Sequence, residues 1–83
     1  MSLLIDWGAE ATKDLLNVPS IESAEQIAQA VYRYGEDRIG FVLHVQVNDG
    51  PNEFRLLIPR MRSYVLVRRS AMTLYVERVI YRP

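Results

Sequence analysis

The spacing of apolar residues divides the chain into a helical first half and a strand-rich second half. Apolar residues recur at helical intervals over residues 9–17, and they do so again from Ser20 or Ser23 to Gly35. Either serine is a suitable N-cap for the second helix, and the glycine is typical of a helix end. Residues 2–7 are apolar but too few to assign by period, and we favour a short strand there.

After Asp37 the apolar residues no longer recur at helical spacing but at every second position, as in a strand. Apolar and other residues alternate over residues 41–47, which predicts a strand. Asn48-Asp49-Gly50-Pro51-Asn52 is a strong turn signal that leads into a second strand at residues 53–58, where Pro59 ends the ladder. Two further strands are expected at residues 62–69 and 73–81.

The order of these elements predicts one α+β domain that covers residues 1–83. A short N-terminal strand and two helices precede an antiparallel β-meander, and a chain of 83 residues has room for a single small core. Both helices should pack on one face of the sheet, since a meander buries one face and leaves the other to solvent or to a partner.

The composition narrows the classes of function. The chain has no cysteine and one histidine, which argues against a disulfide scaffold, a zinc site and a thiol nucleophile. No apolar run approaches the roughly 18 residues that span a bilayer, and the N-terminus does not have the layout of a signal peptide. We therefore expect a cytoplasmic protein that needs no metal, no cofactor and no membrane.

The net charge of zero hides two halves of opposite sign. Residues 1–37 carry two basic and seven acidic side chains, a net charge of −5, and residues 38–83 carry eight arginines and three acidic side chains, a net charge of +5. Such asymmetry points to a charged partner surface, although segregated charge also arises in domains that bind nothing. Nine of the ten basic residues are arginine, which grips phosphates and carboxylates bidentately.

Strand alternation brings arginine and tyrosine onto common faces. In the fourth strand one face carries Arg62, Tyr64, Leu66 and Arg68. In the fifth strand simple alternation puts Leu74, Val76, Arg78, Ile80 and Arg82 on one face and Tyr75, Glu77, Val79 and Tyr81 on the other. Guanidinium groups bind phosphate oxygens and aromatic rings stack on unpaired bases, so the pattern suits RNA. Exposed strand faces need polar residues in any case, and Glu77 is expected in a cross-strand ion pair with a neighbouring arginine.

At this point the sequence resembles the RelE/ParE superfamily of toxins from bacterial type II toxin–antitoxin systems. The opening of that family is similar to Ile5-Asp6-Trp7 followed by Ala9, Ala11 and Asp14-Leu15-Leu16. Its closing strands are similar to Phe54-Arg55-Leu56, to Arg62-Ser63-Tyr64-Val65-Leu66-Val67, and to Leu74-Tyr75-Val76-Glu77-Arg78-Val79 with Arg82 beyond. The resemblance implies the strand, helix, helix, meander order of a RelE-like fold.

The resemblance also implies a function and a set of site residues. RelE-type toxins cleave mRNA on the ribosome without metal, through basic and tyrosine residues on the open sheet face, and they are silenced by an antitoxin protein. By this resemblance Arg62 and Arg82 are the catalytic cations. Where RelE-type nucleases commonly carry a further Tyr or His, this sequence has Pro83, and Tyr81 or Tyr64 is the expected substitute. The expected RNA-binding residues are Arg55, Arg60, Tyr64, Arg68 and Arg78.

Three alternatives remain open from the sequence. ParE-type members of the same superfamily inhibit DNA gyrase and need no nuclease residues. A non-catalytic interaction protein could instead use the acidic helical half, including Glu22 and Glu25, as a mimic of nucleic acid. A single-stranded RNA binder without catalysis would use the same Arg and Tyr face.

Overall fold

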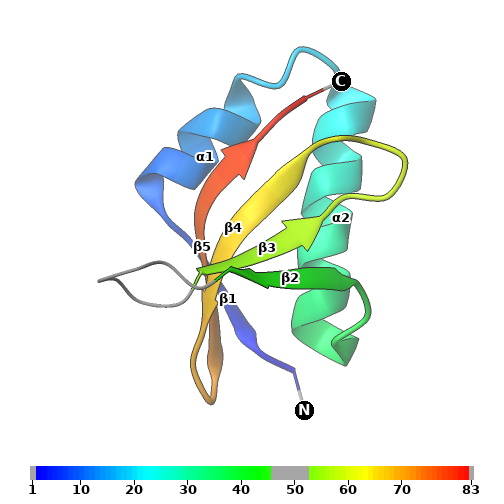
Figure 1. The fold of residues 1–83 in the computed structure, drawn as a ribbon. Helices are drawn as coiled ribbons and strands as arrows, with labels where there is room; N and C mark the ends of the chain where they lie inside the picture. The colour runs from blue at the N-terminus through cyan, green and yellow to red at the C-terminus, as the bar shows by residue number, and fades with distance from the viewer. Residues whose placement is uncertain (1, 46–52, 83) are drawn as a thin grey trace.

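A computed structural model describes residues 2–45 and 53–82 of the chain (Figure 1). The turn expected at residues 48–52, and residues 46 and 47 of the preceding strand, lie outside the described residues. The elements in chain order are β1 (Leu4–Trp7), α1 (Ala9–Leu16), α2 (Ile21–Asp37), β2 (Phe41–Val45), β3 (Glu53–Leu57), β4 (Tyr64–Arg69) and β5 (Thr73–Ile80). The α+β class expected from the sequence is confirmed.

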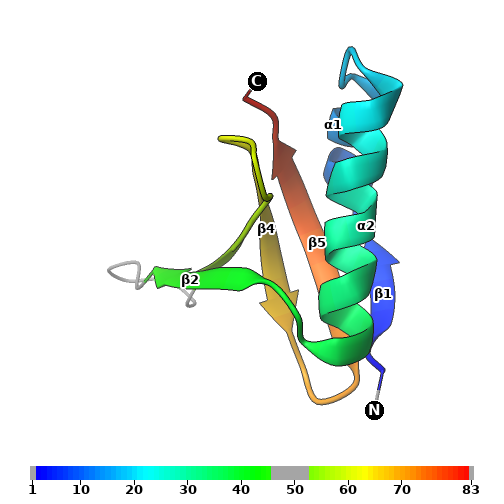
Figure 2. The same ribbon diagram turned by 90° about the vertical axis from the view of Figure 1, so that its right-hand side faces the viewer.

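The five strands form one mixed sheet in the order β1-β5-β4-β3-β2. Strands β2 to β5 are antiparallel neighbours, as expected for a meander, while β1 pairs in parallel with β5 at the far edge. Figure 2 shows both helices on the same side of β4 and β5, whereas β2 runs away from α2. One face of the sheet therefore carries the helices, and the other face carries none of the described elements.

The long helix α2 begins where the sequence indicates but ends later. The Ser20 hydroxyl is the N-cap and accepts a hydrogen bond of 3.2 Å from the Ser23 backbone N–H. The expected end at Gly35 is wrong, because the helix continues to Asp37 and closes at Arg38, whose φ of 60° is left-handed. Gly35 instead permits close packing, since a Cβ there would lie 2.9 Å from Cδ1 of Ile5.

The hydrophobic core lies between α2 and the helix-bearing face of the sheet. It consists of Leu3, Ala11, Ile27, Val31, Tyr34, Leu56, Ile58, Val65, Val67, Leu74, Val76 and Val79. In β4 the buried residues alternate as expected, with Val65 and Val67 inside. The Tyr34 hydroxyl at the margin of the core accepts a hydrogen bond of 2.7 Å from Arg69 Nη1, so its polar end is satisfied.

The alternation expected along the last strand is wrong because β5 contains a bulge. Leu66 of β4 pairs with Arg78 while the next residue, Val67, pairs with Val76, so Glu77 has no partner across the ladder. The extra residue reverses the parity. Leu74 and Val76 face the core before the bulge, and Val79 faces it afterwards. Tyr75, Arg78 and Ile80 thus share the open face, a grouping that strict alternation forbids.

The strands that flank the β3–β4 connection are shorter than expected. Strand β3 ends at Leu57 and β4 begins at Tyr64, so Arg62 precedes the strand in which the sequence places it. The connection turns at Arg60, which has a φ of 67°, and the Ile58 N–H closes it with a hydrogen bond of 3.1 Å to the Ser63 carbonyl. Arg62 is accordingly a loop residue next to the end of the sheet.

Candidate functional site

The open face of the sheet mixes arginine, tyrosine and apolar side chains. Register and burial place on it Phe41, Leu43, Arg55, Leu57, Tyr64, Leu66, Arg68, Tyr75, Arg78 and Ile80. Four of the five residues expected to bind RNA are in this set, and Arg60 is outside it. We call these ten residues the open face.

Arg55 and Tyr64 form the centre of the open face. The Arg55 guanidinium carbon lies 5.1 Å from the centroid of the Tyr64 ring, within the range of a cation–π contact. The Arg55 Nε atom is buried and has no hydrogen-bond partner among the residues that the structure describes. A buried donor without a partner is costly, so an acceptor that reaches this point would gain a hydrogen bond with a charged group.

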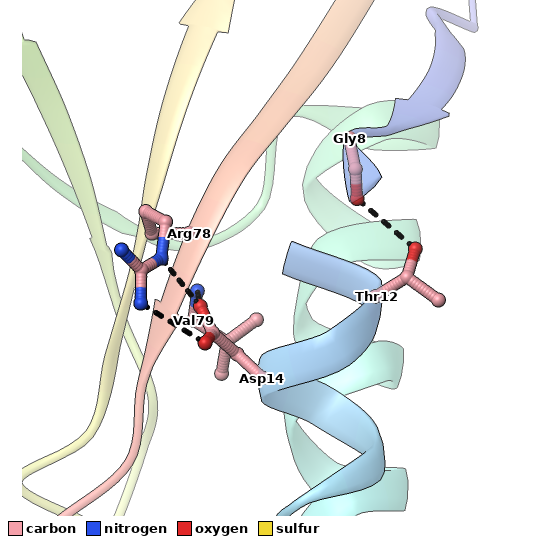
Figure 3. A network of polar contacts seen from close by, with 5 residues as sticks. All are labelled: Gly8, Thr12, Asp14, Arg78 and Val79. Atoms are coloured by element: carbon pink, nitrogen blue, oxygen red, sulfur yellow. Dashed lines mark hydrogen bonds and ion pairs between the residues drawn. The ribbon is translucent and has the colours of Figure 1, made fainter. Parts of the chain in front are cut away.

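Two other arginines of the open face are already bound by carboxylates. Arg68 forms an ion pair with Glu77, the cross-strand pair expected from the sequence. Arg78 binds Asp14 of α1 in a fork, with Nε 2.7 Å from Oδ2 and Nη2 3.0 Å from Oδ1 (Figure 3). Arg68 and Arg78 were both expected to bind RNA, and in each case a carboxylate of the same chain neutralises the positive charge.

Asp14 also supports the edge of β5. Its Oδ2 atom accepts a hydrogen bond of 3.0 Å from the Val79 backbone N–H, beyond the point where β1 stops pairing with β5. The hydrogen bond from Arg78 lowers the pKa of Asp14 below its usual value; burial opposes this shift, and the Val79 N–H adds to it. The carboxylate raises the pKa of Arg78 in turn. The pair joins α1 to β5 and is first of all structural.

The two predicted catalytic arginines flank one end of the β4–β5 pair. The buried Ser63 hydroxyl donates a hydrogen bond of 3.0 Å to the Arg82 carbonyl and accepts one of 2.8 Å from the Arg82 N–H. The chain after β5 is thereby held against the residue that follows Arg62. Both arginine side chains are exposed, and neither forms an ion pair with the residues that the structure describes.

The two candidate tyrosines occupy different environments. Tyr81 packs against the hydrophobic core. Tyr64 lies on the open face, two residues after Arg62, and pairs with Ile80, two residues before Arg82. The structure therefore groups Tyr64, rather than Tyr81, with the central arginine of the open face.

Arg60 and the lone histidine lie away from this centre. Arg60 lines a hollow with Gln26, Gln29 and Arg33, between α2 and the end of β3. The exposed His44 ring stacks on Phe54, with ring centroids 4.8 Å apart, on the helix-bearing side of β2 and β3. Neither residue shares a surface with Arg55.

Two residues that position arginines of the candidate site were not identified from the sequence. Asp14 holds the Arg78 side chain, and Ser63 holds the backbone of Arg82. Asp14 lies 64 residues before Arg78, and Ser63 lies 19 residues before Arg82. No local pattern connects residues at such separations. The single signal was the type of residue, since a serine within the otherwise apolar and basic run of residues 61–68 has to satisfy its hydroxyl when it is buried.

Two classes of site find no support in the described part of the chain. Residues 2–45 and 53–82 contain no group of three or more His, Cys, Asp or Glu side chains that could hold a metal ion. Within the same residues, neither helix is long and apolar enough to cross a membrane.

Comparisons with protein-family models, curated proteins and solved structures found no match to this chain.

Proposed function

We propose that this chain is the toxin of a bacterial type II toxin–antitoxin pair and that it cleaves mRNA on the ribosome in the manner of RelE. The proposal rests on the resemblance of the sequence, together with one structural observation. That observation is the Arg55–Tyr64 contact at the centre of a sheet face that no described helix covers. A partly desolvated guanidinium beside an aromatic ring is suited to a phosphate and its base.

The chemistry needs charge stabilisation and proton transfer. The 2′-hydroxyl oxygen bonds to the adjacent phosphorus as the bond to the 5′-oxygen breaks, with loss of the 2′-hydroxyl proton and gain of a proton by the leaving oxygen. Arg62 and Arg82 stabilise the charge on the phosphoryl oxygens, since an arginine stays protonated at ordinary pH. Tyr64, which lies on the open face, donates its phenolic proton to the leaving 5′-oxygen, and solvent water accepts the proton of the 2′-hydroxyl.

An antitoxin is the partner that this proposal requires. Phe41, Leu57 and Leu66 accompany the arginines on the open face, so a covering protein would bury apolar area and supply carboxylates to the free guanidinium groups. Such a protein would compete directly with RNA for Arg55.

Expression of the chain without a partner should arrest bacterial growth, and removal of either exposed arginine, Arg62 or Arg82, should relieve the arrest. We expect Arg62→Ala and Arg82→Ala each to raise the plating efficiency of the expressing cells at least about a hundredfold. Loss of one donor that stabilises charge in the transition state typically slows catalysis by about this factor. Arg33→Ala, an exposed arginine on α2, is the matched control and should remain toxic. If the unaltered chain is harmless at verified expression levels, the toxin proposal fails.

Two readouts in arrested cells separate RNA cleavage from gyrase inhibition. RelE-like action should produce new mRNA 5′ ends within translated regions and leave plasmid supercoiling unchanged. Loss of negative supercoiling with intact mRNA would instead assign the chain to the ParE-type alternative. Arrest that depends on Glu22 and Glu25, but on neither Arg62 nor Arg82, would favour the acidic interaction protein.

Binding of short single-stranded RNA should depend on Arg55. Arg55→Met keeps the apolar stem and removes the charge, and we expect it to weaken binding about fivefold to tenfold at low salt. The slope of log K against log salt should fall by about 0.7, the change for one lost phosphate contact with a single strand. Arg33→Met should leave both quantities unchanged. An equal slope for the two variants in filter binding would contradict the assignment of Arg55.

A further inference from the structure

Strand β2 is an unprotected edge of the sheet. Among the described strands it has one neighbour, β3, so its outer backbone groups have no strand beside them. Proteins usually protect such edges with charged residues, proline or a bulge. Phe41–Val45 contains no charged residue and no proline, and its register with β3 is regular.

The opposite edge of the sheet is protected. Strand β1 has four residues, one of them the charged Asp6, and its entry is fixed by a hydrogen bond of 2.7 Å from the Leu3 N–H to the Gly35 carbonyl. Beyond β1, the Asp14 carboxylate accepts a hydrogen bond from the Val79 backbone N–H. Strand addition is therefore favoured at β2 and disfavoured at the other edge.

The edge strand also exposes a row of large apolar side chains. Ile39 is 57% exposed, Phe41 72% and Leu43 52%, at alternate positions of one segment. A groove of about 250 Å³ adjoins them, and Ala30, Leu57 and other mainly apolar residues line it. Apolar side chains grouped along an open edge are typical of an association surface.

We propose that a second copy of this chain covers this surface by antiparallel pairing of β2 with β2 about a two-fold axis through Leu43. In this register Leu43 faces Leu43 and each Phe41 faces Val45 of the other copy. Apolar side chains that lie directly opposite each other across an antiparallel pair, as the two Leu43 side chains do here, stabilise the pairing. The two sheets join into one, and assembly stops at two copies because each has a single open edge.

The charge distribution favours a second copy as the occupant. A strand with no charge pairs with itself without leaving a carboxylate or guanidinium unpaired, and two copies of a chain with zero net charge do not repel each other at long range.

Sedimentation equilibrium of the full chain between about 1 and 100 μM tests the proposal. We expect a monomer–dimer equilibrium that Leu43→Lys weakens at least tenfold, since the two ammonium groups would face each other on the axis. Leu43→Glu should act likewise, and an equimolar mixture of the two variants should dimerise again. Met72→Lys, at a residue 72% exposed in the β4–β5 turn, is the matched control and should dimerise normally. A chain that stays monomeric at 100 μM, or a Leu43→Lys variant that still dimerises, overturns the proposal.

Disulfide formation tests the register of the pairing independently. The chain has no native cysteine, so Leu43→Cys introduces a single thiol. Residues directly opposite in an antiparallel pair have Cα atoms about 4.5 to 5.5 Å apart, which a disulfide can span. We expect Leu43→Cys to form a reducible dimer on mild oxidation and Met72→Cys to remain monomeric. Equal cross-linking of the two variants would rule out an axis at Leu43.

Discussion

Deletion of Tyr75 should strongly destabilise the domain, whereas deletion of Glu77 from the same strand should leave its stability nearly unchanged. Without Tyr75 the rest of β5 can keep its pairing in two ways. Either Leu74, which is fully buried, moves to the open face and Thr73 enters the core, or the bulge closes and Glu77 replaces Val76 inside. Each outcome costs about 3 kcal/mol or more, by loss of a buried leucine or by burial of a carboxylate. Domains of this size are stable by only about 4 to 12 kcal/mol.

Deletion of Glu77 removes the one residue between Leu74 and Ile80 that lacks a partner in β4. Val76 and Arg78 become adjacent, as their partners Val67 and Leu66 already are. Val76 and Val79 keep their inward positions, and Arg78 stays on the open face. The variant loses the Arg68–Glu77 ion pair, which lies at the surface and contributes little.

Urea unfolding followed by circular dichroism distinguishes the two deletions. The Glu77 deletion should show a cooperative transition with a midpoint near that of the intact chain, and the Tyr75 deletion should show none or one shifted far to low urea. If the two deletions destabilise the chain equally, the bulge is not located at Glu77.

The bulge also marks the limit of what alternation can predict. In β4 the pattern of Val65 and Val67 against Tyr64 and Leu66 gave the correct faces, because that strand is regular and pairs on both sides with strands of the meander. In β5 the sequence offers no glycine or proline at the bulge. The extra residue follows from how β5 meets β4 over its whole length, and this is a property of pairing rather than of local sequence.

The residue types of the candidate site could be predicted from the sequence. Which of its arginines are paired with carboxylates could be predicted only in part. The sequence indicated that arginine and tyrosine share an open face, and Arg55 and Tyr64 do so. It also indicated the Arg68–Glu77 pair, whose members lie in adjacent strands. It could not indicate that Asp14 binds Arg78, since a helix in the first half supplies the carboxylate. Of the arginines assigned to RNA on the open face, Arg55 is therefore the one without an ion pair among described residues.

Of the two ion pairs described, Arg78–Asp14 should contribute more to the stability of the fold than Arg68–Glu77. Asp14→Asn keeps the shape of the side chain but removes the charge that binds Arg78, and the amide cannot accept from Val79 and both guanidinium nitrogens equally well. We expect the melting temperature to fall by about 5 °C or more, with solvent screening at the half-exposed Arg78 limiting the effect. Asp6→Asn, at an exposed position of β1, is the matched control and should shift it by less than about 2 °C.

The difference in stability between the unaltered chain and Asp14→Asn should depend on pH with a defined sign. The Arg78 hydrogen bond places the pKa of folded Asp14 below the value near 3.8 of the unfolded chain. The folded state therefore favours the ionised form, so the contribution is present above about pH 5 and is lost as pH falls through 3.8 to the folded pKa. In thermal unfolding of both proteins from pH 7 down to pH 3, the gap between the two melting temperatures should narrow as the pH falls below about 5. A gap that stays constant over this range would mean that the aspartate acts through its shape rather than its charge.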